Sequence, residues 1–216
     1  MSEALKRAVV AHYDEKLELH GPTARGMDWK DAASQRLRFE VLCGIADLDG
    51  RSVHDLGAGA GHLLDFLIER GIRADYSGSD LSKAMVEAAR IRHPGVPFQE
   101  LDVVAGAPDC PTASYDAVVC SGLFHVKLDH TDAEWWGFVA AVVRRMFAMC
   151  RVGIAFNLMS DRVDFRSPSL YYANPGEVVD FCCRELSRYV VLRHDYPLYE
   201  HTIYVYREPP VSLPAD

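Results

Sequence analysis

The chain has 216 residues, of which 49% are hydrophobic and 25% charged, and its formal net charge is -8 at pH 7. This composition is typical of a folded globular protein, and the acidic balance repels a nucleic-acid backbone, so we expect no nucleic-acid partner. No apolar run approaches the roughly 18 residues of a membrane span, and the first residues lack the apolar centre of a signal peptide. We therefore expect no membrane partner and a cytoplasmic location.

Two amphipathic segments come first in the chain. Residues 3–19 place apolar side chains at four-residue steps between charged ones, which predicts a helix with one buried face. A turn signal, His20-Gly21-Pro22, follows, and a second helix is predicted from about Asp31 to Ile45. We expect residues 1–48 to form a helical cap.

From Arg51 to Glu208, apolar strands and helical stretches alternate. Strands are predicted at 52–56, 74–80, 96–102, 115–123 and 152–159, and helices at 62–71, 82–93, 132–150 and 176–186. This order is typical of right-handed βαβ units and a parallel sheet. Two final strands, at 188–196 and 201–208, are too close for a crossover helix, so the last strand must be antiparallel. We expect one domain over 1–216, with a core at 51–208 and a tail at 209–216.

Cysteines are scattered without a framework. They form no CxxC pair and no ligand spacing of a zinc site, so we expect free thiols and no metal. Their positions are Cys43, Cys110, Cys120, Cys150, Cys182 and Cys183.

A glycine-rich stretch, VHDLGAGAGHL, follows the first predicted strand. It places Asp55 before Gly57, Gly59 and Gly61. A dinucleotide fingerprint would need a further glycine where His62 stands, and a phosphate-binding P-loop would need a lysine that the stretch lacks. The pattern still predicts a backbone that approaches a ligand closely.

The stretch from Asp55 to Gly61 resembles motif I of the class I S-adenosylmethionine-dependent methyltransferases. Asp80 ends the second strand, where that family has an acid that pairs with the ribose hydroxyls, and Asp102 falls where it places an acid near the adenine. The segment CSGLF, which includes Ser121, matches the position of motif IV. The segments HGPTARGMDW and YYANPGEVVDFC also resemble those of a group of small bacterial members.

The resemblance implies an α/β, Rossmann-like fold: a seven-stranded, mostly parallel sheet in the order 3-2-1-4-5-7-6, with strand 7 antiparallel, helices on both faces and the N-terminal helical cap. It implies S-adenosyl-L-methionine as the cofactor and S-adenosyl-L-homocysteine as the product. Alternatives stay open for several residues: Asp80 as a helix cap, Asp102 as a turn residue, and Tyr13 and Trp29 as core aromatics. The expected cofactor-binding residues are Asp55, Gly57, Ala58, Gly59, Gly61, Asp80, Leu81, Asp102, Val103, Ser121, Arg38, Tyr13 and Trp29.

Arg38 is expected to pair with the methionine carboxylate of the cofactor, and Tyr13 or Trp29 to cover the sulfonium. His125, directly after CSGLF, is the candidate catalytic base, with a role limited to shaping the pocket as the alternative. The expected substrate-facing residues are Phe124, Asn157, Tyr171 and Tyr172.

These expectations together predict in-line methyl transfer to oxygen or nitrogen of a small metabolite, by a monomer or homodimer. Two alternatives remain at this point. One is an enzyme of the same fold that uses the bound cofactor without transferring its methyl group. The other is a non-catalytic cofactor-binding or interaction protein.

Overall fold

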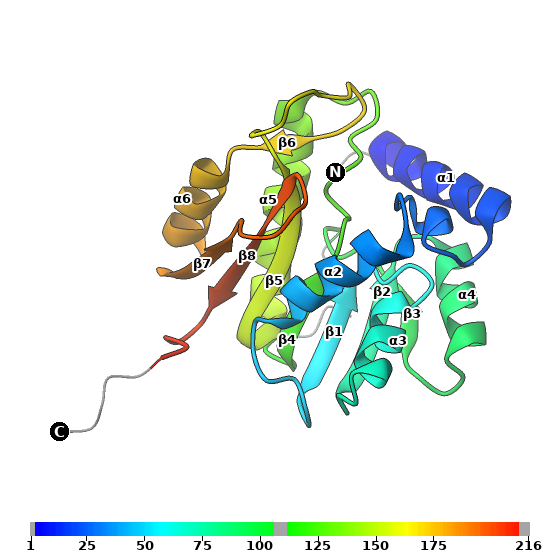
Figure 1. Cartoon of the computed structure of the whole chain (residues 1–216), viewed down its shortest axis with the longest axis horizontal. Helices are drawn as coiled ribbons and strands as arrows, with labels where there is room; N and C mark the ends of the chain where they lie inside the picture. The colour runs from blue at the N-terminus through cyan, green and yellow to red at the C-terminus, as the bar shows by residue number, and fades with distance from the viewer. Residues whose placement is uncertain (1–2, 106–111, 212–216) are drawn as a thin grey trace.

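The computed structural model describes residues 3–105 and 112–211, and it is built around one central sheet (Figure 1). The strands are β1 Ser52–Leu56, β2 Asp75–Asp80, β3 Phe98–Glu100, β4 Tyr115–Cys120, β5 Cys150–Ser160, β6 Tyr172–Ala173, β7 Tyr189–Arg193 and β8 Glu200–Tyr206. The helices are α1 Glu3–His20, α2 Ala32–Cys43, α3 His62–Glu69, α4 Lys83–Arg92, α5 Asp132–Met149 and α6 Pro175–Glu185, with a short 3-10 helix, η1 Arg25–Met27.

The sheet has the predicted order. Its strands run β3-β2-β1-β4-β5-β8-β7, and β8 is antiparallel to both β5 and β7. With β7 and β8 as the sixth and seventh predicted strands, this confirms the order 3-2-1-4-5-7-6. The two-residue strand β6, which pairs with the end of β5, was not predicted because it is too short to leave a periodic pattern.

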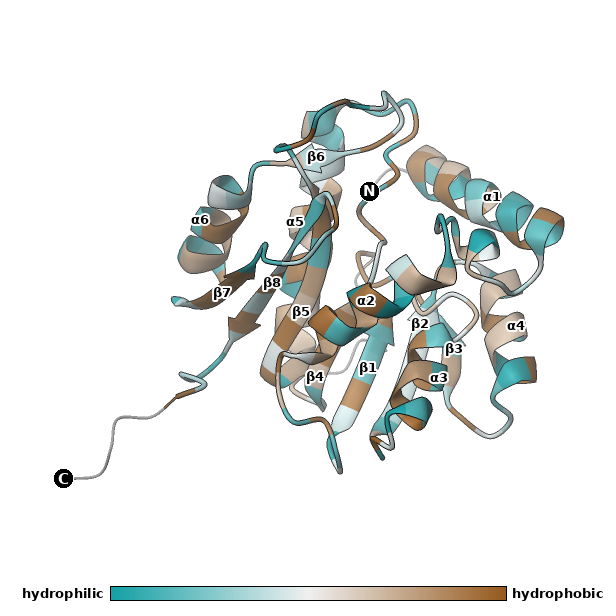
Figure 2. Cartoon of the chain, viewed as in Figure 1, coloured by the Kyte–Doolittle hydropathy of each residue, from teal (hydrophilic) through white to brown (hydrophobic). Residues whose placement is uncertain are grey.

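Apolar residues on both faces of the strands explain why the sheet is covered twice. On one face, Trp135 and Met146 of α5 and Phe181 of α6 pack in a single cluster. On the other face, Leu42 of α2 and Leu67 of α3 belong to a second cluster. In Figure 2, α1 alternates between hydrophilic and hydrophobic colours, as its amphipathic sequence predicts. Within the described parts of the chain, no helix is both long and apolar enough to cross a membrane.

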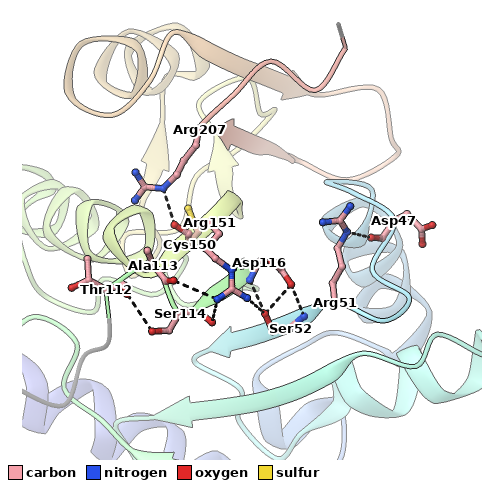
Figure 3. A network of polar contacts seen from close by, with 10 residues as sticks. All are labelled: Asp47, Arg51, Ser52, Thr112, Ala113, Ser114, Asp116, Cys150, Arg151 and Arg207. Carbon is pink, nitrogen blue, oxygen red and sulfur yellow. Dashed lines mark hydrogen bonds and ion pairs between the residues drawn. The ribbon is translucent and has the colours of Figure 1, made fainter.

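A polar network connects the N-terminal ends of the central parallel strands (Figure 3). Arg151 of β5 donates to the carbonyl of Ser114 at 2.7 Å and to Ser52 Oγ at 2.8 Å. Asp116 of β4 accepts from Arg151 Nε at 3.1 Å and from the backbone amide of Ser52 at 2.9 Å. These contacts join the starts of β1, β4 and β5. The C-terminal ends of the same strands are where open parallel sheets bind ligands.

The starts of the helices differ in a way that bears on function. Asp31, Ser82, Thr131 and Asn174 each cap the helix that follows by accepting a backbone hydrogen bond. Gly61, which precedes α3, has no side chain and a φ of 80°. Its position leaves the first amide groups of α3 without a side-chain cap. The five described cysteines are free thiols, and Cys110 lies outside the described residues.

Candidate active site

A cavity open to solvent, with about 850 Å³ of space including its mouth, lies where β1, β2 and β4 end, and we call it the central cavity. Its wall comes from α1, from the stretch that runs from η1 into α2, from the glycine loop, from the end of β2 with the start of α4, and from the loop after β4. Figure 1 shows α1 at the end of the sheet toward which β1 points. Ten of the residues predicted from sequence line it: Tyr13, Trp29, Asp55, Gly57, Ala58, Gly59, Asp80, Leu81, Ser121 and His125.

The glycine loop bends in a way that only glycine tolerates well. Gly57, Gly59 and Gly61 have φ values of 76°, 53° and 80°, all in the left-handed region. A β-carbon at Gly59 would lie 2.6 Å from Met27 Sδ. The same sulfur accepts a hydrogen bond from the amide of Ala60 at 3.3 Å. The loop is therefore in close contact with the cap at Gly59, where there is no room for a side chain.

Asp80 lies at the centre of the candidate cofactor site. Its Oδ2 accepts from the amide of Gly59 at 2.9 Å, and its Oδ1 accepts from the amide of Ser82 at 2.9 Å. Burial raises its pKa, while these backbone hydrogen bonds oppose the rise. The N-cap of α4 is Ser82, whose Oγ accepts from Met85, so the alternative of Asp80 as that cap is wrong.

A second hollow of about 340 Å³ adjoins the central cavity and shares Gly57, Asp80 and Leu81 with it. Asp102 and Val103, expected near the adenine, both line this hollow. Asp102 Oδ1 also accepts from two backbone amides, each at 3.0 Å, as the turn alternative predicts. Burial acts to raise the pKa of Asp102, but Lys6 and these amides hold it below its ordinary value.

Asp55 is buried at the end of β1, beneath the glycine loop. The hydroxyl of Tyr76 donates to its Oδ2 at 2.8 Å. Burial raises the pKa of Asp55 to about 7, and the nearby carboxylate of Asp80 acts in the same direction. Two acidic groups thus lie close to the space where the resemblance places a sulfonium cation.

Trp29 connects the cap to the loop after β4. A β-carbon at Gly122 would lie 2.3 Å from the Trp29 ring, so that ring packs directly on the backbone there. Its centre is 5.6 Å from the ring of His125 in an edge-on arrangement. The guanidinium of Arg38 lies 4.2 Å from its centre. Trp29 therefore contacts both the cap and the candidate base, in addition to lining the cavity.

Arg38 has a different partner from the one expected. Its Nε lies 2.7 Å from Oε1 of the fully buried Glu200, and it does not line the central cavity. Asn157 donates to Glu200 Oε2 at 2.6 Å and accepts from the amide of Gly122 at 2.8 Å. His125 Nε2 lies 3.3 Å from the same Glu200 oxygen. Contact of Arg38 with the cofactor carboxylate thus stays a prediction without support from this geometry.

Four residues expected at the acceptor do not line the central cavity. Asn157 belongs to the Glu200 network, and Phe124 is buried against Phe138 and Phe156. Tyr171 lines a separate hollow beside α6, and the hydroxyl of Tyr172 accepts from the amide of Ser167 at 2.9 Å. Their contact with an acceptor also remains a prediction that the geometry does not support. The residues concerned are Phe124, Asn157, Tyr171 and Tyr172.

Sequence reasoning missed several parts of the site. Met27 and His62 line the central cavity, and the buried Glu200 contacts both Arg38 and His125 beside it. His62 directly follows Gly61, which was a usable signal. Gln35 donates to His62 Nδ1 at 3.2 Å, and His62 Nε2 donates to the carbonyl of Pro22 at 3.1 Å. Glu200 carries no local motif, because its role depends on partners from distant elements.

Comparison with known proteins establishes the family. The model of a methyltransferase domain matches residues 53–147. The Mycobacterium tuberculosis protein Rv1506c, which carries the name of a methyltransferase, is 40% identical over 159 residues, which cover 73% of this chain and 93% of that protein. The chain belongs to the class I S-adenosylmethionine-dependent methyltransferases.

A second relative and a solved structure are also similar to this methyltransferase. Trans-aconitate 2-methyltransferase of Acidovorax is 36% identical over 88 residues, which cover 38% of this chain and 34% of that enzyme. The solved structure of magnesium protoporphyrin IX methyltransferase from Synechocystis with bound S-adenosylmethionine has a similar fold, with a TM-score of 0.58 at 16% identity over 82% of this chain and 81% of that one. The methyltransferase uses S-adenosyl-L-methionine as its cofactor.

Proposed function

We propose that this methyltransferase transfers the methyl group of S-adenosylmethionine to an oxygen or nitrogen of a small molecule by in-line displacement. The observation that carries the proposal is the central cavity, in which the glycine loop and Asp80 face Tyr13, Trp29 and His125. The cap lies over the ends of the strands, and a concave site of this kind suits a small acceptor better than a macromolecule.

The residues present fit the cofactor. Gly57 and Gly59 line the cavity with backbone alone, and Asp80 keeps a buried carboxylate between the two hollows, where it would accept from the ribose hydroxyls. Asp102 and Val103 would border the adenine, and the uncapped first amides of α3 would face the carboxylate end. Bound there, the cofactor supplies an electrophilic methyl group on a sulfonium. Ser121 Oγ, which is buried and has no hydrogen-bond partner among the described residues, is a further candidate contact.

We assign His125 the role of orienting the acceptor. Burial lowers its pKa to about 3, and the nearby Arg38 and His201 act in the same direction, so the ring is neutral at physiological pH. The Glu200 carboxylate beside Nε2 favours the tautomer with its proton on that nitrogen. Nδ1 is then the acceptor atom of the ring. A base with so low a pKa is weak, whereas a hydrogen bond that aligns the nucleophile contributes to the rate without lasting proton transfer.

The experiment combines binding with turnover. S-adenosylhomocysteine affinity is measured by calorimetry, and the protein is then incubated with S-adenosylmethionine carrying a labelled methyl group and a panel of small hydroxyl and amine compounds. Labelled product detected by mass spectrometry, and lost in Asp80→Ala, supports the proposal. An acceptor that changes without taking up label favours cofactor use without transfer. Binding without any reaction across the panel favours a non-catalytic role.

A further inference from the structure

The charged groups on the wall of the central cavity are all acidic. Asp28, Asp55 and Asp80 line it, and none of its described lining residues is a lysine or arginine. The segments outside the described residues, 1–2, 106–111 and 212–216, contain no lysine or arginine either. Two histidines also line it, His62 and His125, and burial lowers the pKa of both, so neither provides a lasting positive charge.

The partly buried lysines and arginines of the cap helices close to the cavity are already paired. On α1 and α2, the lysines and arginines that are not exposed are Lys6, Lys16 and Arg38. Lys16 Nζ lies 2.9 Å from Asp28 Oδ1, and Arg38 Nε lies 2.7 Å from Glu200 Oε1. Lys6 pairs with Asp102. An anionic ligand inside the cavity would have to break one of these ion pairs to gain one of these three side chains as a cationic partner.

On the side that faces the glycine loop, the wall of the cavity is apolar and aromatic. Val10 and Tyr13 come from α1, Trp29 from the cap segment, and Leu123 and Val126 from the loop after β4. A carboxylate placed there would lose water and gain neither a lysine or arginine side chain nor a strong set of donors from the wall, which is costly in free energy. An uncharged molecule would lose little hydration and would gain apolar contact.

We infer that the methyl acceptor is an uncharged, largely apolar molecule that carries a hydroxyl or amine, and that the cavity rejects carboxylates. The inference rests on the proposed function, since it names the class of acceptor for the same site. The sulfonium of the cofactor is the one cation that the acidic wall is suited to receive, and the acceptor approaches it from the apolar side. By this inference trans-aconitate, a tricarboxylate, is not a substrate of this enzyme.

Matched probes test the inference. The protein saturated with S-adenosylhomocysteine is titrated at pH 7.5 with 3,4-dihydroxybenzamide and with 3,4-dihydroxybenzoate, which differ in a neutral amide against a carboxylate, and with trans-aconitate. We expect the amide to bind at least tenfold more tightly than the benzoate, and trans-aconitate to give no heat. Equal or tighter binding of either carboxylate, or failure of the amide to bind, would overturn the inference.

A charge placed in the wall provides the reciprocal test. Val10 is partly exposed on α1, so Val10→Lys adds a cation to the cavity with little threat to folding. The variant should reduce or reverse the preference for the amide. The same change at the exposed Val211, Val211→Lys, should leave the preference as it is. An unchanged ratio in Val10→Lys would contradict the electrostatic explanation.

The binding readout separates this inference from the proposed function. If the amide is preferred but no labelled methyl group reaches any acceptor, charge selection by the cavity holds and methyl transfer fails. If labelled methyl reaches carboxylates more readily than neutral compounds, methyl transfer holds and the inferred acceptor class fails.

Discussion

The guanidinium of Arg38 and the carboxylate of Glu200 form an ion pair in the interior of the protein. Nε and Oε1 are 2.7 Å apart, and the two side chains are 12% and 0% exposed. The pair joins cap helix α2 to β8, and through Asn157 and Gly122 it also reaches the loop that carries His125. The position of the cap over the cavity therefore depends on a contact between residues that are far apart in the chain.

We predict that Glu200→Gln destabilises the fold by about 3–5 kcal/mol, because it leaves the buried Arg38 without a counter-charge. Urea unfolding followed by circular dichroism measures the loss. The matched control is Asp49→Asn, which removes an exposed pair with Arg73 and should cost less than about 1 kcal/mol. Replacement of both partners, Arg38→Met with Glu200→Leu, should cost less than Glu200→Gln alone. An equal loss of unfolding free energy in Glu200→Gln and Asp49→Asn would contradict a buried ion pair.

Asp80→Ala is predicted to weaken S-adenosylhomocysteine binding by one to two orders of magnitude, because a hydrogen bond to a charged group contributes about 1.5–3 kcal/mol. Calorimetry measures the affinity. Asp75→Ala, at the exposed start of the same strand, is the control and should bind as the unchanged protein does. An unaltered dissociation constant in Asp80→Ala would remove Asp80 from the cofactor site.

Most of the fold could be predicted from the sequence, because the pattern of apolar strands and amphipathic helices is local. The sheet order and the antiparallel last strand followed from such patterns together with the family resemblance, and the glycine loop and Asp80 were identified in the same way. Glu200 and Met27 could not be found so, because no pattern near either residue indicates its contact. Arg38 was expected at the cofactor carboxylate, but in the structure it pairs with Glu200, whose strand, β8, lies more than 150 residues later in the chain.

Gly59→Ala tests the close contact between the glycine loop and the cap. The new β-carbon would lie 2.6 Å from Met27 Sδ at a φ of 53°, so both a clash and backbone strain are expected. Gly71→Ala is the control, because its φ is 72° and no atom lies within 4 Å of the added carbon. We expect Gly59→Ala to lose cofactor affinity and Gly71→Ala to keep it. Met27→Ala in the Gly59→Ala background should recover part of the loss, and no recovery would contradict the proposed clash.

The pH dependence of turnover tests the role of His125. Because the pKa of this histidine is lowered to about 3, its ring stays neutral from pH 5 to pH 9. We predict that the pH–rate profile has no inflection from His125 in that range. His125→Asn should lower kcat more than it raises KM, because it disturbs the alignment of the acceptor. An inflection near pH 6.5 that disappears in His125→Asn would show instead that the residue titrates as a base.

Acid sensitivity of the fold is predicted from His54, which lies in β1 away from the cavity. Its two ring nitrogens contact Ser77 Oγ at 2.8 Å and Ser79 Oγ at 2.9 Å, and burial lowers its pKa to about 4. The unfolded chain, with a histidine pKa of about 6.5, binds more protons than the folded one between these two values. The stability from the neutral ring is therefore complete above about pH 6.5 and is lost as the pH falls toward 4, by up to about 1.4 kcal/mol per pH unit.

Urea unfolding at a series of pH values measures this loss. In His54→Asn the free energy of unfolding should fall less steeply with acid than in the unchanged protein, so the two curves converge toward pH 4. His20→Asn, at the exposed end of α1, should keep the original slope. The raised pKa of Asp55 acts in the opposite direction in both proteins, because the folded state then binds the extra proton, and it cancels when the two curves are compared. Parallel curves for His54→Asn and the unchanged protein would mean that folding does not lower the pKa of His54.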